Sequence, residues 1–388
     1  METRDRLTHL RPNRTQRWLV RAALLSGEQA VEAWKHWRTT ADLGRLDIAS
    51  RQLLPLLYKN LLDHGVQDRM MGRLRGVYQA TWAKNQQTFH AVAPLLRAFR
   101  EAGIETMILK GAALILGQYG NPGLRTMLDF DFLVPAAKAR KAVALLEARG
   151  WRPRKRCTEK SFLAHHAWSF EAENGHGLDL HWRLLPEFGH GHDDSVFWKA
   201  AVKTMVHDAP TLALGPTDQL FQTCVHGLGR DSVALFRMIA DAQSVLTASS
   251  DALDWDRLAA HARKHHLALR LRAALTLLKE LLNSPVPEPV LRELRSVPVS
   301  KFETREYGIV TRPFGVLGAL PLVWTHYRRA RTRRLGGQPG VRSFPEGLVG
   351  YIQGYWGIES KRHLPLYIVF KGFERPWRYL KTKLKPEG

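Results

Sequence analysis

Apolar residues recur at helical spacing through the N-terminal quarter of the chain. Spacings of three and four appear in WLVRAALL, in RQLLPLLYKNLLDHG and in a long run from Met70 to Phe99. Gly103 then stands in REAGIE, where a left-handed helix cap is expected. The pattern predicts a helical N-terminal region over residues 1–102, with local breaks at Pro55 and Pro94.

Between Ile104 and Leu185 the pattern changes to short apolar runs that surround a single helix. We expect strands in IETMILK, FDFLV, HAWSFEAE and LDLHWRLL, and a helix from about Ala136 to Arg149. The last two runs are joined by NGHG, in which Asn174-Gly175 is a strong hairpin signal. The pattern predicts an α+β domain with a mixed sheet and flanking helices over residues 103–215, with an antiparallel hairpin inside it.

Helical periodicity returns after this region, in TDQLFQTCVHGL, ALFRMIADAQSVL and LALRLRAALTLLKELL. Pro216 precedes the first of these runs, and proline is tolerated in the first turn of a helix. We therefore predict a helical domain over residues 216–297 and a basic, aromatic-rich C-terminal segment over residues 298–388.

The charge of the chain is strongly positive. Its 388 residues include 58 Lys and Arg but 36 Asp and Glu, which gives a net charge of +22. Such a field attracts phosphate, whether it belongs to a nucleotide, a nucleic acid or an anionic lipid.

The C-terminal segment carries part of this charge among aromatic residues. Trp324 and Tyr327 stand beside five arginines, Arg328, Arg329, Arg331, Arg333 and Arg334, and further aromatics follow up to Tyr379. Aromatic side chains among cations can stack on bases, lie at an anionic membrane surface, or pack on the core while the charges are solvated. All three interpretations remain open.

Cysteine usage and hydropathy narrow the class of protein. Cys157 and Cys224 are far apart, so the sequence suggests neither a disulfide framework nor a cysteine zinc site. The N-terminus is charged where a signal peptide would be apolar, and no apolar run approaches the ~20 residues of a spanning helix. We expect a cytoplasmic protein that does not span a membrane.

Two aspartates separated by one residue stand in the segment TMLDFDFLVP. Residues i and i+2 of a strand point to the same face, so Asp129 and Asp131 present carboxylates about 6 to 7 Å apart. Like charges at that spacing repel unless a cation lies between them. Because hard ions such as Mg²⁺ take oxygen ligands, the pair predicts a site for Mg²⁺ or Mn²⁺. The alternative is that Asp129 is a turn or strand-entry residue and that Asp131 is an exposed position of the strand.

A third carboxylate normally completes a metal site for phosphoryl transfer. Asp179 in GLDLHW is the candidate, because its two apolar neighbours would face the opposite side of the strand. His181 follows on the same face and is a plausible neighbour of the site.

The chain upstream of the aspartates offers groups that suit phosphate. Lys110 and Gly111 end the run ILK and open the run AALILGQ. Gly111 permits close approach to the backbone, and the helix start offers free amides to an anion. Lys110 adds a point charge, and Arg125 adds a forked donor four residues before Asp129. We expect Lys110, Gly111 and Arg125 to bind a nucleotide.

The stretch ILKGAALILGQYGNPGLRTMLDFDFLV resembles a pattern near LKG..L....Y..pg.R...D.D.LV, which is found in uncharacterised bacterial nucleotidyltransferases of the DNA polymerase beta-like superfamily. The later GLDLHWRLLP and PTDQLFQTCVHGL are similar to that family's next strand and helical segment, so the resemblance covers roughly residues 50–280. It implies a polymerase beta-like domain in which Asp129 and Asp131 hold metal, Asp179 is the third carboxylate and Gly111 touches phosphate.

Two functions are compatible with this resemblance. The first is an enzyme that uses Mg²⁺ or Mn²⁺ to transfer NMP from a nucleoside triphosphate to a hydroxyl of an unknown acceptor, such as a tRNA, a protein or peptide, or a small molecule. The alternative is a catalytically inactive protein of the same fold that binds RNA, a peptide or an anionic membrane surface. Ala112 replaces the serine that usually follows the glycine, which favours the alternative. The three aspartates favour the enzyme.

Other polar positions suggest structural roles. The run FGHGHDD, with His190, His192, Asp193 and Asp194, matches no common zinc spacing and is interpreted as a polar loop before the helix DSVFWKA. We interpret His226 and Asp241 as structural partners within the helical region.

Overall fold

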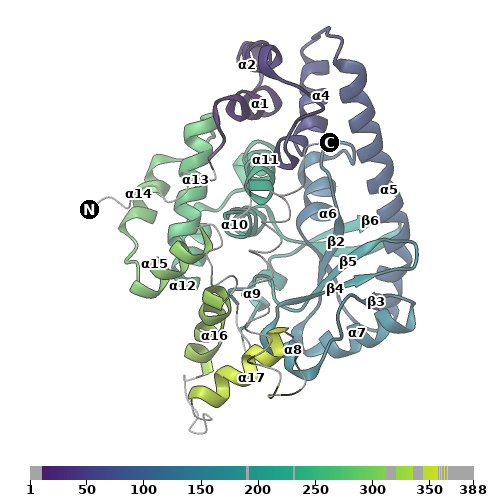
Figure 1. Cartoon of the computed structure of the whole chain (residues 1–388), viewed down its shortest axis with the longest axis vertical. Coiled ribbons are helices and arrows are strands. Elements are labelled where there is room, and N and C mark those ends of the chain that lie inside the picture. Colours follow the sequence, from purple (N-terminus) through teal and green to yellow (C-terminus); the bar gives the residue numbers. More distant parts are fainter. Residues whose placement is uncertain are drawn as a thin grey trace.

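The computed structural model describes residues 11–188, 192–229, 232–311, 320–334 and 344–356, with four single residues beyond them. Within these ranges, seven strands form one mixed sheet in the order β3-β4-β5-β2-β1-β7-β6 (Figure 1). The strands are β1 Met107–Ile108, β2 Asp129–Leu133, β3 Arg152–Pro153, β4 Ala167–Glu171, β5 Gly177–His181, β6 Val202–Val206 and β7 Ala209–Ala213.

The sheet is mixed because its central strands pair in both directions. β2 is parallel to β5 and antiparallel to β1, while β1 is parallel to β7. The predicted α+β class is confirmed, and the four predicted strands correspond to β1, β2, β4 and β5. β3 and the β6–β7 hairpin were not predicted from the apolar pattern. Val202 and Met205 of β6 are exposed, so this edge strand lacks a regular buried face.

The two faces of the central strands have different surroundings. Phe130 and Phe132 of β2 and Leu178 and Leu180 of β5 are fully buried in a cluster that also contains residues of α5 and α7. The alternate residues of the same strands, Asp129, Asp131, Asp179 and His181, therefore lie on the other face. The period-2 alternation thus places every predicted acidic residue on one side of the sheet.

The β4–β5 hairpin predicted at Asn174-Gly175 is confirmed. Ala172 and His176 close a loop in which Gly175 has a φ of 81°. Positive φ favours glycine, because it has no side chain to clash with the backbone. The loop is one residue longer than the two-residue hairpin turn that Asn-Gly favours most.

Helices cover the sheet and build the rest of the molecule. Those before and within the sheet are α1 Arg14–Leu24, α2 Gly27–Thr40, α3 Ile48–Arg51, α4 Leu54–Asp63, α5 Met71–Glu101, α6 Lys110–Leu114, α7 Ala139–Ala148, α8 Glu159–Ala164 and α9 Ser195–Lys199. α5 ends at the predicted cap, where Gly103 has a φ of 68°. Pro55 lies in the first turn of α4, but Pro94 lies inside α5, so the break predicted at Pro94 was wrong.

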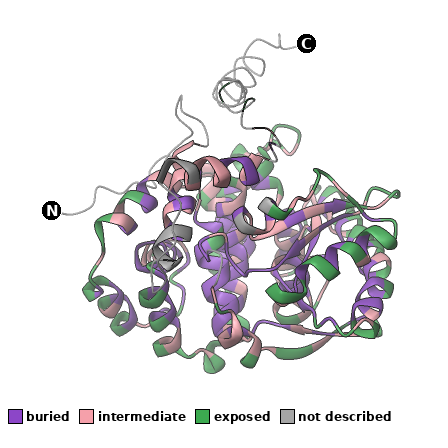
Figure 2. Cartoon of the chain, turned by 90° about the horizontal axis from the view of Figure 1, so that it is seen from below, coloured by how far each residue is buried: buried purple, intermediate pink, exposed green. Residues whose placement is uncertain are grey.

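The described residues from Pro216 onward are mainly helical, and the helices predicted between residues 216 and 297 are present. The helices of this part are α10 Pro216–Gly227, α11 Ser232–Ala248, α12 Trp255–His265, α13 Ala268–Leu282, α14 Glu288–Ser296, α15 Lys301–Val310, α16 Leu320–Arg334 and α17 Phe344–Trp356. α10 and α11 lie between the sheet and helices α12 to α14 (Figure 1). Buried residues are concentrated in these central helices and along the strands (Figure 2).

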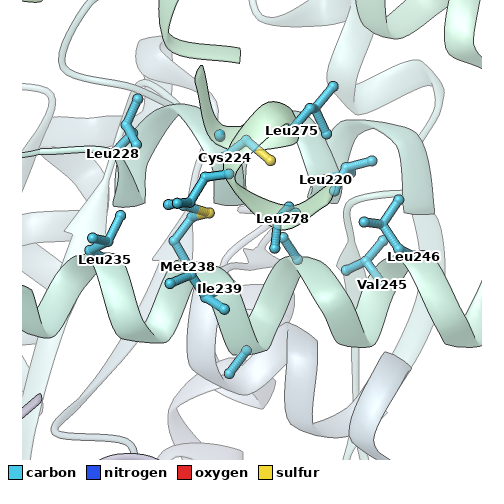
Figure 3. Packing of buried hydrophobic residues seen from close by; sticks show 14 of the residues in the cluster. Leu220, Cys224, Leu228, Leu235, Met238, Ile239, Val245, Leu246, Leu275 and Leu278 are labelled. Atoms are coloured by element: carbon cyan, nitrogen blue, oxygen red, sulfur yellow. The ribbon is translucent and has the colours of Figure 1, made fainter. Parts of the chain in front are cut away.

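The core of this helical half is a cluster from α10, α11 and α13 (Figure 3). Leu220 and Cys224 face Leu275 and Leu278, and all four are fully buried. The same cluster includes Leu133 of β2 and Leu109, which follows β1. The helical half is therefore packed directly against the face of the sheet that carries the acidic residues.

The basic C-terminal segment is only partly exposed. Arg329 of α16 is buried, and its guanidinium forms an ion pair with Glu306 of α15 and donates to the carbonyl of His265. Arg329 is therefore not solvated, so the interpretation in which the charges of this segment are solvated was wrong for this residue. The side chains of Arg331, Arg333 and Arg334, and the aromatics beyond Pro365, lie outside the described residues.

Within the described ranges, none of the helices has the length and apolar character that crossing a membrane requires.

Candidate functional site

The pairing of β2 with β5 brings the predicted acidic residues together. The strands are parallel, and their register places Asp131 opposite Asp179 and Asp129 opposite Gly177. Side chains opposite each other in adjacent strands lie on the same face. Asp131 is buried, whereas Asp129 and Asp179 retain partial solvent contact.

One oxygen of Asp131 accepts two hydrogen bonds. Lys110 Nζ lies 2.6 Å from Asp131 Oδ1, and His181 Nε2 lies 2.9 Å from the same oxygen. Lys110 begins α6 with a φ of 47°, a left-handed conformation that is uncommon outside glycine. Such backbone strain recurs at functional sites. The predicted neighbour His181 is therefore a direct partner of the central carboxylate.

The charges of the site perturb each other in opposite directions. Burial alone would raise the pKa of Asp131, but the ammonium of Lys110 and the hydrogen bond from His181 outweigh it and hold that pKa well below its usual range. The pKa of Asp129 is raised by burial and by repulsion from Asp131 and Asp179. Lys110 and Arg237 each offset part of the repulsion at Asp129, but its pKa stays raised, so negative charge at the site is not fully balanced.

Three of these side chains have the composition of a metal site. Asp131, Asp179 and His181 each offer one ligand atom, and these atoms lie within 4.8 Å of one another. His181 is 1% exposed, and its Nδ1 has no hydrogen-bond partner in the described part of the chain. Carboxylate and imidazole groups are ordinary ligands of divalent ions. The residues present therefore fit the divalent metal that the family resemblance implies, with Asp129 beside them on the same face.

The loop that leads into β2 is fixed by a buried ion pair. Arg125 Nε and Nη2 lie 2.8 and 2.9 Å from the two oxygens of Asp241, and the Tyr119 hydroxyl donates to the same carboxylate at 2.9 Å. We call Arg125, Asp241 and Tyr119 the clasp. Asp241 lies on α11, but its partners Arg125 and Tyr119 lie outside the helical region, so the interpretation of His226 and Asp241 as structural partners within that region was wrong for Asp241.

Gly111 makes room for this clasp. A Cβ atom at Gly111 would lie 2.5 Å from Arg125 Nη1 and 3.0 Å from Met127 Cγ. The glycine therefore permits the close passage of Arg125. The predicted contacts of Gly111 and Arg125 with a nucleotide stay predictions, as does that of Lys110.

A turn of π-helix links α6 to the clasp. It spans Ile115–Tyr119, and Tyr119 is its last residue. π-helical turns are rare and occur often at functional sites.

Two histidines near the site were not predicted to belong to it. The ring of His166 lies 5.3 Å from that of His181, edge to face, and burial lowers the His166 pKa well below its usual value. Desolvation of the ring and the nearby ammonium of Lys110 lower the pKa of His226 of α10 to about 3, although the residue as a whole is exposed. Both rings are therefore neutral near pH 7. His226 lies in the segment PTDQLFQTCVHGL, which is part of the family resemblance, so the sequence offered a reason to place it near the site. No spacing or motif in the sequence indicated the same for His166.

The described residues of FGHGHDD have contacts within the loop and, through the rings of Phe188 and His192, with His265 of α12 at 4.5 and 5.0 Å. Asp193 accepts hydrogen bonds from the backbone and hydroxyl of Ser195, where α9 begins. His192 stacks on Phe188 at 4.0 Å and lies 3.3 Å from Asp194. His190 lies outside the described residues.

Comparison with known proteins assigns the family. The chain matches the family model described as "Uncharacterised nucleotidyltransferase" over residues 46–283. Among solved structures it is similar to an antigenic nucleotidyltransferase-like protein from Paracoccidioides brasiliensis, with 15% identity, a TM-score of 0.32, and coverage of 55% of this chain and 94% of that chain. No curated protein matches. The family match spans more than half of the chain and confirms the predicted resemblance. The chain therefore belongs to the family of uncharacterised nucleotidyltransferases.

Proposed function

We propose that this protein is a metal-dependent nucleotidyltransferase that transfers NMP from a nucleoside triphosphate to a hydroxyl of an acceptor. The observation that carries the proposal is the grouping of Asp131, Asp179 and His181 on two adjacent parallel strands, in a chain of this family. The excess acid charge at the site supports it, because a bound cation would offset the repulsion that raises the pKa of Asp129.

The reaction forms a bond between the acceptor oxygen and the α-phosphorus. The bond from that phosphorus to the bridging oxygen breaks, pyrophosphate leaves, and the hydroxyl proton passes to solvent. A bound divalent ion would supply charge stabilisation to the phosphate and lower the pKa of the acceptor hydroxyl. The protein's own part is to hold two carboxylates in fixed register, which is the positioning that phosphoryl transfer requires.

Lys110 is the cation best placed to meet a phosphate. Its ammonium lies at the site, and its side chain is 22% exposed. Arg125 has two of its nitrogens bound to Asp241, and Nη1 donates to the Thr126 carbonyl at 3.3 Å. Its contribution to phosphate would therefore come mainly through the position of its loop.

The test is to incubate the purified protein with each labelled nucleoside triphosphate, Mg²⁺ or Mn²⁺, and a cell extract. We expect a labelled product from at least one triphosphate. The double variant Asp129→Asn with Asp131→Asn should lose it, while a matched double variant of the exposed acids Glu171 and Glu173 should keep it. Equal labelling by both double variants would exclude the proposal.

One observation favours an inactive binding protein as a second candidate. Lys110 already neutralises Asp131, so the fold supplies a cation of its own to the central carboxylate. In that case the net charge of +22 would serve RNA binding, and the affinity for RNA should fall steeply with salt while no label is transferred.

A further inference from the structure

We propose that His181 is itself a ligand of the metal, and that its nitrogen makes the site select Mn²⁺ over Mg²⁺. This inference rests on the proposed function only in that it assumes a divalent ion at the site. The inference makes His181 bind the metal directly. Its place on β5 alone would only make it a neighbour of the two carboxylates.

The first support is the distance between His181 and Asp131. Two ligands bound at right angles to one ion, each about 2.1 Å from it, lie about 3 Å apart. His181 Nε2 and Asp131 Oδ1 are 2.9 Å apart. The pair therefore already has the separation of adjacent ligands, and an ion can take the place of the proton between them.

The position of Asp179 supports the same arrangement. Its ligand atom lies within 4.8 Å of those of Asp131 and His181, although Asp179 and His181 are separated by one residue of β5. The parallel register holds all three on one face, since Asp131 pairs with Asp179 and Leu133 pairs with His181. An ion between these atoms would complete a set of two oxygens and one nitrogen.

The second nitrogen of His181 leaves the ring free to bind a metal. A neutral imidazole that binds metal through Nε2 carries its proton on Nδ1. Nδ1 of His181 is buried and has no hydrogen-bond partner in the described part of the chain, so no described group prevents it from carrying the ring proton. An ion bound at Nε2 would replace the hydrogen bond from Nε2 to Asp131, and the ring proton would then lie on Nδ1.

A nitrogen ligand changes which ion the site prefers. Mg²⁺ binds oxygen donors and demands near-ideal octahedral geometry, whereas imidazole suits first-row transition ions. Mn²⁺ accepts both donor types and resembles Mg²⁺ in charge and coordination. A site of two carboxylates and one buried imidazole should therefore bind Mn²⁺ more tightly than Mg²⁺.

The decisive measurement is pulsed electron paramagnetic resonance of Mn²⁺ bound to the full-length protein. A directly bound imidazole gives a ¹⁴N coupling on the Mn²⁺ signal. We expect this coupling, and we expect Mg²⁺ to displace Mn²⁺ only at a concentration at least about tenfold higher. Bound Mn²⁺ without a nitrogen coupling, or no bound Mn²⁺, would overturn the inference without any variant being needed.

Variants localise the nitrogen. His181→Gln should abolish the coupling and weaken Mn²⁺ binding by about tenfold or more, the scale found even for outer-shell partners. His176→Gln, in the hairpin loop of the same two strands, is the matched control and should retain both. A coupling that survives in His181→Gln would assign the nitrogen to another residue and overturn the inference.

The outcomes separate this inference from the proposed function. A ¹⁴N coupling without nucleotide transfer would support the ligand and reject the enzyme. Nucleotide transfer with Mg²⁺, together with a Mn²⁺ signal that lacks nitrogen coupling, would support the enzyme and reject His181 as a ligand.

Discussion

Two buried aspartates in this molecule have similar hydrogen bonds but different electrostatic surroundings. Asp218 of α10 accepts from Arg257 Nε and Nη2 at 2.9 and 2.7 Å, and His261 Nε2 lies 3.0 Å from its Oδ1. Asp131 of β2 likewise has one cationic partner and one histidine. A description of each aspartate by its hydrogen bonds alone would treat them as equivalent.

The difference lies in the charges beyond these partners. Asp218 is an acid whose cation is bound in a forked, two-point contact, and burial is outweighed by the hydrogen bonds from His261 and Arg257, so its pKa is lowered. Asp131 shares its one ammonium with Asp129 and Asp179 nearby, and the pKa of Asp129 is raised. A closed ion pair contributes to the fold, whereas unbalanced charge on one face marks a place for a ligand.

The largest expected effect is on activity. Asp131→Asn should lower the rate of nucleotide transfer about 10³-fold, because a lost metal contact removes several kcal/mol of transition-state stabilisation and each ~1.4 kcal/mol is tenfold in rate. Asp218→Asn should leave the rate per folded molecule within about threefold, since its partners lie in the helical half. Initial rates with labelled triphosphate measure both. Equal losses in the two variants would remove the distinction between the regions.

The next effect is on stability and should fall on the other aspartate. Asp218→Asn should lower the free energy of unfolding by about 3 kcal/mol, at the lower end for breaking a buried pair, because Arg257 can still reach solvent. Urea denaturation followed by circular dichroism measures it. A loss below about 1 kcal/mol would show that the Asp218 pair is as dispensable as a surface contact.

A smaller effect of opposite sign is expected at Asp129. Its pKa is raised in the folded state, so the ionised carboxylate opposes folding above that pKa, and this cost disappears as pH falls through it. Asp129→Asn should therefore stabilise the fold at pH 7 by about 0.5 to 1 kcal/mol, with the gain vanishing in acid. Melting temperatures of both proteins between pH 7 and pH 3 test this. A variant less stable than the parent at pH 7 would contradict the charge excess.

The smallest effect serves as the reference for the two effects on stability. Arg140 and Glu159 form an ion pair with side chains 62% and 72% exposed. Arg140→Ala should leave the midpoint of urea denaturation unchanged within error, because solvent and salt screen exposed pairs. A resolved decrease in that midpoint would mean that exposed pairs cannot be used as the baseline for this protein.

Local patterns in the sequence sufficed for the strands of the site. The alternation in FDFLV and LDLHW placed Phe130 and Leu178 on one face of the sheet and Asp131 and Asp179 on the other. This assignment is local, because it depends only on residues two positions apart in the same strand. The pairing of β2 with β5 is different, because it depends on how the chain between them folds. The alternation therefore predicted which residues share a face, and the sheet topology then determined that Asp131 and Asp179 are adjacent.

Contacts between distant residues account for what the sequence did not predict. Arg329 stands among other arginines in the sequence, which suggests a basic tail. In the fold it is buried in an ion pair with Glu306, which lies on a separate helix. Arg125 looked like a phosphate ligand because it stands close to Asp129 along the chain, yet its forked contact is with Asp241. Residue type and spacing predict the chemistry that a side chain can perform, while its partner depends on packing.

The clasp has a consequence for the synthesis of the protein. Arg125 and Asp241 are 116 residues apart in the chain. At about 5–20 residues per second, a ribosome would complete Asp241 roughly 6 to 23 s after Arg125. Before Asp241 is added, all three acidic residues of the site have been made, but Arg125 still lacks its ion-pair partner. At that stage the loop that leads into β2 depends on contacts with earlier residues, such as that of Asn85 with the Arg125 carbonyl. Completion of the site is therefore a late event in translation, and an emerging chain holds its acidic residues before it can orient them.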